Sequence, residues 1–149
     1  MPANFTKSHA PEFYAMIEKR NLNILIAEDD ADDADFILES FGKHEYFQKV
    51  EIVKNGKELI EYVLNKEREK PDIILTDINM PLMNGLQALE EISKLNEYSE
   101  VLKFVYSTSI NPSYKTLYSA LDISGWITKP YTFNEFQKIP AQIIQVMGA

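Results

Sequence analysis

Residues 71–85 have the sequence Pro-Asp-Ile-Ile-Leu-Thr-Asp-Ile-Asn-Met-Pro-Leu-Met-Asn-Gly, and this stretch decides the fold class. The apolar run from Ile73 to Leu75 predicts a strand that is buried on both faces, as strands are in parallel sheets. The strand must end near Asp77, because Pro81 cannot donate a hydrogen bond to a ladder. Open α/β sheets bind ligands at the carboxyl ends of their strands, so Asp77 is the first candidate functional residue.

Four other apolar segments predict further strands, over residues 23–27, 50–53, 101–106 and 125–128. Segments with helical periodicity separate them, beginning near Ala34, Leu59, Leu86 and Pro112, and a last helical region follows Thr132. Strands that alternate with helices form βαβ units and a parallel sheet. We therefore predict an α/β, flavodoxin-like (βα)5 fold, with a doubly wound parallel five-stranded sheet in the order 2-1-3-4-5.

Local signals predict several element boundaries. Gly42 closes the first helix, and Asn55-Gly56 is a turn signal before the second. Pro140 lies inside the last helical region, where a proline costs about 3 kcal/mol. We expect that region to break near residues 138–139 and to restart with Pro140 in its first turn.

The composition excludes several classes of protein. The 149 residues suffice for one domain, predicted over residues 22–149, with an N-terminal extension over residues 1–21. The net charge of −8 opposes the phosphate contacts that nucleic-acid binding requires. The absence of cysteine excludes disulfides and thiolate chemistry, and no apolar stretch approaches the roughly 18 residues of a membrane helix. We expect a cytoplasmic protein with no nucleic-acid or membrane partner.

The N-terminal extension contains one predicted helix. Pro11 would begin it and Arg20 would lie near its end, and its apolar side carries Phe13, Met16 and Ile17. This helix either packs on its own domain or contacts a partner, which includes a second copy in a homodimer. The first ten residues lack the apolar centre of a signal peptide.

Polar side chains follow four of the predicted strands at one edge of the sheet: Glu28 and Asp29, Asp77, Ser107 and Lys129. Converging carboxylates repel one another unless a cation offsets their charge. Oxygen ligands without cysteine or histidine select a hard cation, and Mg²⁺ fits best. An aspartate nucleophile, a metal ion, a lysine and a hydroxyl together form a site that accepts a phosphoryl group as aspartyl phosphate.

Three further acids lie close to this edge in the sequence. Asp32, Asp33 and Asp35 fall in the first turn or so of the first predicted helix, where negative charge suits the helix dipole. We expect them to be solvated residues of a helix start and not ligands.

Nearly the whole chain from about residue 21 resembles the receiver domain of two-component response regulators, in particular stand-alone chemotaxis-type regulators. The resemblance rests on Glu28-Asp29, Asp77-Ile-Asn-Met-Pro-Leu-Met-Asn-Gly85, Ser107 and Lys129-Pro130. The Asp-x-x-Met-Pro run with the other positions in order is a highly specific signature. No output domain is expected after Pro130, since one helical region accounts for the remaining residues.

The resemblance implies that Asp77 accepts a phosphoryl group from the phosphohistidine of a sensor histidine kinase or a histidine phosphotransfer protein. It implies a Mg²⁺ ion ligated by Asp29, Asp77 and the backbone carbonyl of Asn79, with Glu28 acting through water. The family often has aspartate where Glu28 stands, and this substitution argues against direct coordination by Glu28.

The resemblance also implies a conformational switch. Ser107 and Lys129 would bind the phosphoryl oxygens and shift the surrounding loops. Trp126 occupies the place of the family's switch aromatic, usually tyrosine or phenylalanine, and it acts either as that switch or as a partly exposed packing residue. A downstream protein target is expected to bind the switched surface. The surface predicted for this contact is formed by Tyr114, Tyr118, Trp126 and Tyr131.

Three rival functions fit parts of the same pattern. An aspartate-nucleophile phosphatase of the haloacid-dehalogenase type places its nucleophile after the first strand, with a second aspartate two residues on, where this chain has Asn79 after Asp77. A flavin protein of the same topology needs a glycine in the loop after Ser107, and that loop has none. A receiver fold that binds partners without being phosphorylated stays open. We expect no enzymatic activity beyond slow self-phosphorylation and self-dephosphorylation.

Overall fold

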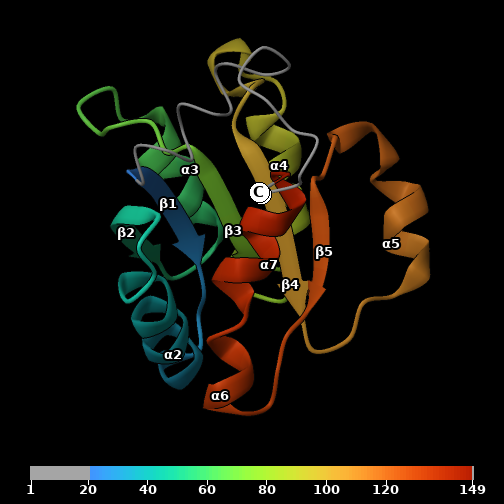
Figure 1. Ribbon diagram of the computed structural model, residues 1–149. Helices are drawn as coiled ribbons and strands as arrows, with labels where there is room; N and C mark the ends of the chain where they lie inside the picture. The colour runs from blue at the N-terminus through green and yellow to red at the C-terminus, as the bar shows by residue number, and fades with distance from the viewer. Residues whose placement is uncertain (1–20, 149) are drawn as a thin grey trace.

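Five parallel strands form the centre of the computed structural model, which describes residues 21–148 (Figure 1). Their order in the sheet is β2-β1-β3-β4-β5, as predicted. Parallel strands place all their carboxyl ends at one edge of the sheet. The strands are β1 (Leu22–Ala27), β2 (Phe47–Val53), β3 (Ile73–Asp77), β4 (Leu102–Ser107) and β5 (Gly125–Thr128).

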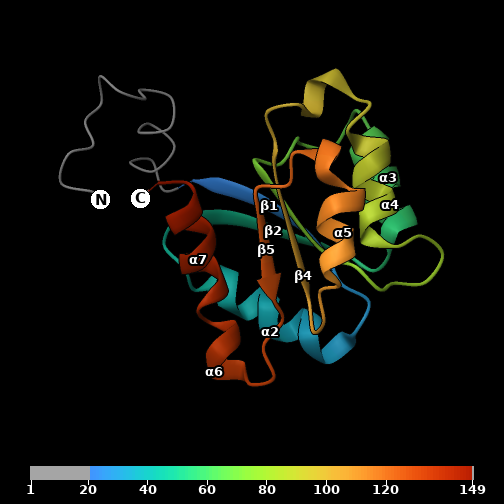
Figure 2. The ribbon, with the colours of Figure 1, turned by 90° about the vertical axis from the view of Figure 1, so that its right-hand side faces the viewer.

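Helices connect the strands and cover both faces of the sheet (Figure 2). One face carries α2, α6 and α7, and the opposite face carries α3, α4 and α5. Two single turns of 3₁₀ helix lie in the chain before β4 and β5, respectively: η1 (Asn96–Tyr98) and η2 (Ser119–Leu121). The α-helices are α2 (Ala31–Gly42), α3 (Gly56–Leu64), α4 (Gly85–Ile92), α5 (Pro112–Leu117), α6 (Phe133–Phe136) and α7 (Ile139–Val146).

Side-chain caps begin the α-helices from α2 to α6, whereas α7 has none. Asn55 accepts a hydrogen bond from the backbone N–H of Glu58, so the predicted Asn55-Gly56 turn is instead the cap and first residue of α3. The predicted break in the last helical region is confirmed, because α6 ends at Phe136 and α7 begins at Ile139 with Pro140 in its first turn.

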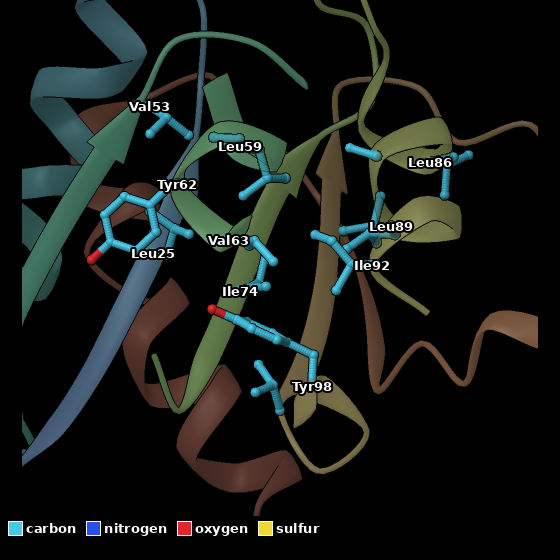
Figure 3. Packing of buried hydrophobic residues seen from close by; sticks show 14 of the residues in the cluster. Leu25, Val53, Leu59, Tyr62, Val63, Ile74, Leu86, Leu89, Ile92 and Tyr98 are labelled. Atoms are coloured by element: carbon cyan, nitrogen blue, oxygen red, sulfur yellow. The ribbon is translucent and has the colours of Figure 1, made fainter. Parts of the chain in front are cut away.

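The core consists of two layers, one on each face of the sheet. Along β1, Ile24 and Ile26 belong to the layer under α2, α6 and α7, whereas Leu25 belongs to the layer under α3 and α4. This alternation follows from the two-residue period of a strand. Figure 3 shows the second layer, in which Leu25 and Ile74 of the sheet pack with Leu59, Leu89 and other apolar residues of the helices.

Strand β3 runs through the centre of the sheet and delivers Asp77 to its carboxyl edge. All five of its residues are buried, as the apolar run predicts. Gly85 begins α4 directly against the end of this strand, and a Cβ at position 85 would collide with the backbone oxygen of Asp77. Glycine at this position therefore lets α4 pack against the strand end that carries Asp77.

Two predictions about the chain differ from the structure or fall beyond it. Strand β2 begins at Phe47, three residues before the predicted start. The prediction missed its first residues because they lie at an edge of the sheet and most of them are exposed or half-buried, which weakens the apolar pattern. The predicted N-terminal helical extension over residues 1–21 lies outside the described residues, except for Asn21. Within residues 21–148, no helix combines the length and the apolar character needed to cross a membrane.

Candidate functional site

Three carboxylates meet at the carboxyl edge of the sheet. Glu28 and Asp29 follow β1, Asp77 ends the adjacent strand β3, and one oxygen from each lies within 4.8 Å of the others. Oxygens on opposite sides of a Mg²⁺ ion lie about 4.2 Å apart, so small side-chain rotations bring this group to ligand spacing. The donor set consists of oxygen alone, which suits Mg²⁺ or a similar hard cation.

Asp77 is held in place from two sides. It is 6% exposed, its Oδ1 accepts a hydrogen bond of 2.6 Å from the backbone N–H of Ile78, and its Oδ2 accepts one of 2.7 Å from the ammonium of Lys129. Burial raises the pKa of the Asp77 carboxyl, while the hydrogen bond and charge of Lys129 oppose that shift. The carboxylate thus has a fixed orientation beside a cation.

Lys129 lies inside the cluster of acids. Its Nζ donates hydrogen bonds to Asp77 Oδ2 at 2.7 Å, to Glu28 Oε1 at 2.7 Å and to Asp33 Oδ2 at 3.1 Å. Burial alone would lower the pKa of Lys129, but the hydrogen bonds and charges of Asp77 and Glu28 raise it above its ordinary value. The backbone N–H of Lys129 also donates to the carbonyl of Ser107, which joins the ends of β5 and β4.

Asp33 corrects one expectation. It was predicted to be solvated together with Asp32 and Asp35, which are indeed exposed. Asp33 is instead half-buried, and its carboxylate pairs with Lys129. The reason is its place in α2: the helix is capped by Asp30, and the third residue after the cap lies over the end of the sheet. A pattern that gives only the helix start does not reveal this direction.

Glu28 is 1% exposed, and both of its oxygens already accept hydrogen bonds. Oε2 accepts one from the backbone N–H of Asp30 at 3.1 Å. Oε1 accepts one from Lys129 and another of 2.5 Å from the hydroxyl of Tyr106. The structure therefore holds Glu28 mainly through protein donors.

Tyr106 is a member of this site that the sequence analysis missed. It lies on β4 opposite Asp77 of β3, and its side chain is fully buried. Burial, followed by the charge of Glu28, raises the pKa of Tyr106 well above its ordinary value. The available signal was a tyrosine inside a strand that is apolar but for Lys103 and the terminal Ser107, since a buried phenol requires a hydrogen-bond partner.

The remaining predicted residues follow Tyr106 or Asp77, or precede Lys129, in the chain. Ser107 is buried at the end of β4, and its hydroxyl donates to the backbone carbonyl of Ser109 at 3.2 Å. Asn79 is exposed, two residues beyond Asp77. Trp126 on β5 is half-buried and packs against the core layer under α3 and α4, with Lys115 Nζ 6.0 Å from the centre of its ring.

Comparisons with known proteins bear on this geometry. The sequence profile of the response regulator receiver domain matches residues 24–140. The chain belongs to the response regulator receiver domain family. Receiver domains are signalling domains of two-component systems, and the acidic cluster of Glu28, Asp29 and Asp77 fits the phosphorylation and Mg²⁺ site of such a domain.

Individual relatives agree with this assignment. The receiver domain is 33% identical over 93 residues to a protein-glutamate methylesterase/protein-glutamine glutaminase of Methanococcoides burtonii, a match that covers 61% of this chain and 25% of that protein. It is 27% identical to the phosphorylated cyanobacterial phytochrome response regulator RcpA, with a TM-score of 0.74 and coverage of 84% and 92% of the two chains.

A third relative shares the fold. The Mn²⁺-bound form of response regulator Rcp1 is 21% identical, with a TM-score of 0.73, and the alignment covers 83% of this chain and 91% of Rcp1. Because the receiver domain spans only a quarter of the methylesterase, the likeness to that protein concerns one part of it.

Proposed function

We propose that this receiver domain accepts a phosphoryl group on Asp77 from the phosphohistidine of a sensor histidine kinase or a histidine phosphotransfer protein. The observation that carries the proposal is the position of the Asp77 carboxylate, which is 2.7 Å from the Lys129 ammonium at the centre of the acidic cluster. The same geometry supports Mg²⁺ as the cofactor, held by Asp29, Asp77 and the backbone carbonyl of Asn79, with Glu28 acting through water.

The transfer is a displacement at phosphorus. A carboxylate oxygen of Asp77 forms the new P–O bond, and the P–N bond to the donor histidine breaks. The bonding electron pair stays on the imidazole nitrogen. The Lys129 ammonium, already beside Asp77 Oδ2, is placed to attract the phosphoryl oxygens.

The charge of the site supports a role for a divalent cation. The site contains the carboxylates of Glu28, Asp29, Asp33 and Asp77, and the Lys129 ammonium pairs with all of them except Asp29. These five groups together carry an excess of three formal negative charges. This excess repels a phosphoryl donor. Mg²⁺, when bound, would neutralise two of these charges and shield the phosphoryl oxygens.

Phosphorylation would act as a switch on the end of β4. The Ser107 hydroxyl now donates to the carbonyl of Ser109, and a phosphoryl group on Asp77 offers a stronger acceptor. Shifting a population from 1% to 99% active requires a differential stabilisation of about 5.5 kcal/mol. Two or three new charge-assisted hydrogen bonds, at about 1.5–3 kcal/mol each, supply that amount. The shifted β4–α5 loop and the face of α5 and β5 would then bind a downstream protein.

On that face, Trp126 acts either as the switch aromatic or as a packing residue. It packs half-buried between Lys115 and the core layer, and a change in the β4–α5 loop would alter this packing. Like Trp126, Tyr114 and Tyr118 are partly buried against the core, whereas Tyr131 is 86% exposed. The predicted contact surface is therefore less exposed in this structure than the sequence pattern indicates.

The test is phosphorylation by acetyl phosphate, followed by intact mass. Wild type with Mg²⁺ is expected to gain the mass of one phosphoryl group, and chelation of Mg²⁺ is expected to abolish the gain. Asp77→Asn should gain nothing, while Asp35→Asn, which makes the same change at an exposed acid of α2, should behave as wild type. A wild type that gains no phosphoryl group under any of these conditions would favour a receiver domain that only binds partners.

A further inference from the structure

Tyr106 has a geometry that neither the family signature nor the proposed ligand set accounts for. Its fully buried ring lies 4.9 Å from Lys129 Nζ, and its hydroxyl donates to Glu28 Oε1 at 2.5 Å. In the pairing of β3 with β4 it lies directly opposite Asp77. The Tyr106 side chain thus contacts both Glu28 and Lys129, and it lies on the strand that pairs with the strand of Asp77.

The hydroxyl has a specific effect on Glu28. Because Tyr106 and Lys129 share Oε1 and the N–H of Asp30 takes Oε2, no carboxylate oxygen of Glu28 lacks a protein donor. A phenol is protonated near neutral pH, so the Tyr106 hydroxyl acts there as a donor to Glu28. The orientation of Glu28 is consequently set by donors of the protein on both of its oxygens.

We propose that Tyr106 is a positioning residue for phosphoryl transfer: its hydroxyl orients Glu28, and Glu28 together with the Tyr106 ring fixes the Lys129 ammonium beside Asp77. This inference rests on the proposed phosphorylation of Asp77. It assigns to the residue before Ser107 a role in the chemistry, in addition to filling the core layer under α2, α6 and α7.

Removal of the hydroxyl should affect Mg²⁺ binding and phosphoryl transfer differently. Without it, Oε1 of Glu28 has Lys129 as its only donor, so the carboxylate turns more freely and offers an oxygen to a bound cation. The ammonium then loses its fixed place relative to Asp77. Mg²⁺ binding is therefore retained or strengthened while phosphoryl transfer slows. General damage to the site would weaken both.

The test compares Tyr106→Phe with wild type at saturating Mg²⁺. We expect phosphorylation by acetyl phosphate to slow about tenfold, which corresponds to one hydrogen bond to a charged group, with a dissociation constant for Mg²⁺ no higher than that of wild type by calorimetry. Tyr98→Phe is the matched control, because Tyr98 is also a buried tyrosine but belongs to the core layer on the other face of the sheet. It should leave both quantities unchanged.

A double-mutant cycle adds a second readout. If the hydroxyl acts through Glu28, Tyr106→Phe has little further effect in a Glu28→Gln background. If Tyr106→Phe melts too low for the assays, both measurements are repeated on it and on wild type at a lower temperature, at which both proteins are folded.

Two results would overturn the inference: a Tyr106→Phe rate within about twofold of wild type, or a slower rate accompanied by equally weakened Mg²⁺ binding. The first outcome, with an active wild type, leaves the proposed function standing. A wild type that is never phosphorylated refutes the proposed function itself.

Discussion

Asp29 is the acid of the site that faces solvent, and its replacement by asparagine should stabilise the metal-free protein. Its carboxylate lies within 4.8 Å of oxygens from both Glu28 and Asp77, and Lys129 contacts those two residues but not Asp29. Asp29→Asn keeps the shape of the side chain and removes one of the mutually repelling charges. The gain in stability thus measures the repulsion between Asp29 and the other carboxylates in the metal-free folded protein.

The magnitude follows from the spacing of the charges. Two unit charges 4.8 Å apart repel by about 3.5 kcal/mol at an effective dielectric constant of 20 and by about 0.9 kcal/mol in water. Because Asp29 is exposed, the lower figure applies, and we expect a gain of about 1 kcal/mol. For a domain of this size that raises the Tm by about 2–4 °C.

Mg²⁺ should reverse the ranking of the two proteins. At a hundred times its dissociation constant, a ligand stabilises the folded state by about 2.7 kcal/mol, which corresponds to a rise of about 5–10 °C in the Tm of wild type. Asp29→Asn loses a charged ligand and should show less than half of that rise.

Thermal melts with and without Mg²⁺ provide the assay, and Asp35→Asn provides the control. Asp35 is an exposed acid of α2 outside the acidic cluster, so its replacement should change the metal-free Tm little and leave the full response to Mg²⁺. The reasoning is refuted if Asp29→Asn melts no higher than wild type without metal, or if it keeps the full response to Mg²⁺.

Three further predictions concern the scaffold. Gly85→Ala should lose about 2 kcal/mol in urea unfolding and slow phosphorylation, because the added methyl group collides with the backbone of Asp77. Leu82→Gly should gain about 1 kcal/mol in the same assay, because Leu82 has a left-handed φ of 68° and a side chain that is 79% exposed. His44→Gln should lose less stability than wild type between about pH 7.5 and pH 5.5. Burial, opposed by Glu45, lowers the pKa of His44 in the folded protein, so the unfolded chain binds a proton first as pH falls below the ordinary pKa, and wild type loses stability there.

Each of these has a comparison that isolates the cause. Gly42→Ala adds the same methyl group where nothing lies within 4 Å, and it should cost no stability. Leu82→Ala removes most of the side chain but keeps the strained φ, so a gain equal to that of Leu82→Gly would contradict the backbone explanation. Equal losses of stability in His44→Gln and wild type would show that other groups account for the pH dependence.

The sequence was sufficient for the fold because the central strands are buried on both faces. Apolar runs such as Ile73–Leu75 mark these strands, and the rules of parallel sheets then leave few arrangements. The edge strand β2 was placed too short, because its half-exposed residues dilute the apolar signal. The pair Asn55-Gly56 predicts a turn but begins α3 in the structure, since a cap and a turn use the same residue types.

The candidate site was predictable to the extent that it depends on strand ends. Glu28, Asp29 and Asp77 come together because parallel strands deliver them to one edge. The contacts of Asp33 and Tyr106 were not predictable, since they depend on the tilt of α2 over the sheet and on the reach of a buried ring. Those features arise from packing between segments that lie far apart in the sequence.

The most direct measurement is the location of the phosphoryl group. Protein treated with acetyl phosphate and Mg²⁺ is reduced with borohydride, which converts an aspartyl phosphate into homoserine, and its peptides are mapped by mass. We predict conversion at Asp77 alone, within the peptide that carries residues 71–85. Conversion at Asp29 or Asp30, or no conversion in a protein shown to bind Mg²⁺, would contradict the proposed role of Asp77.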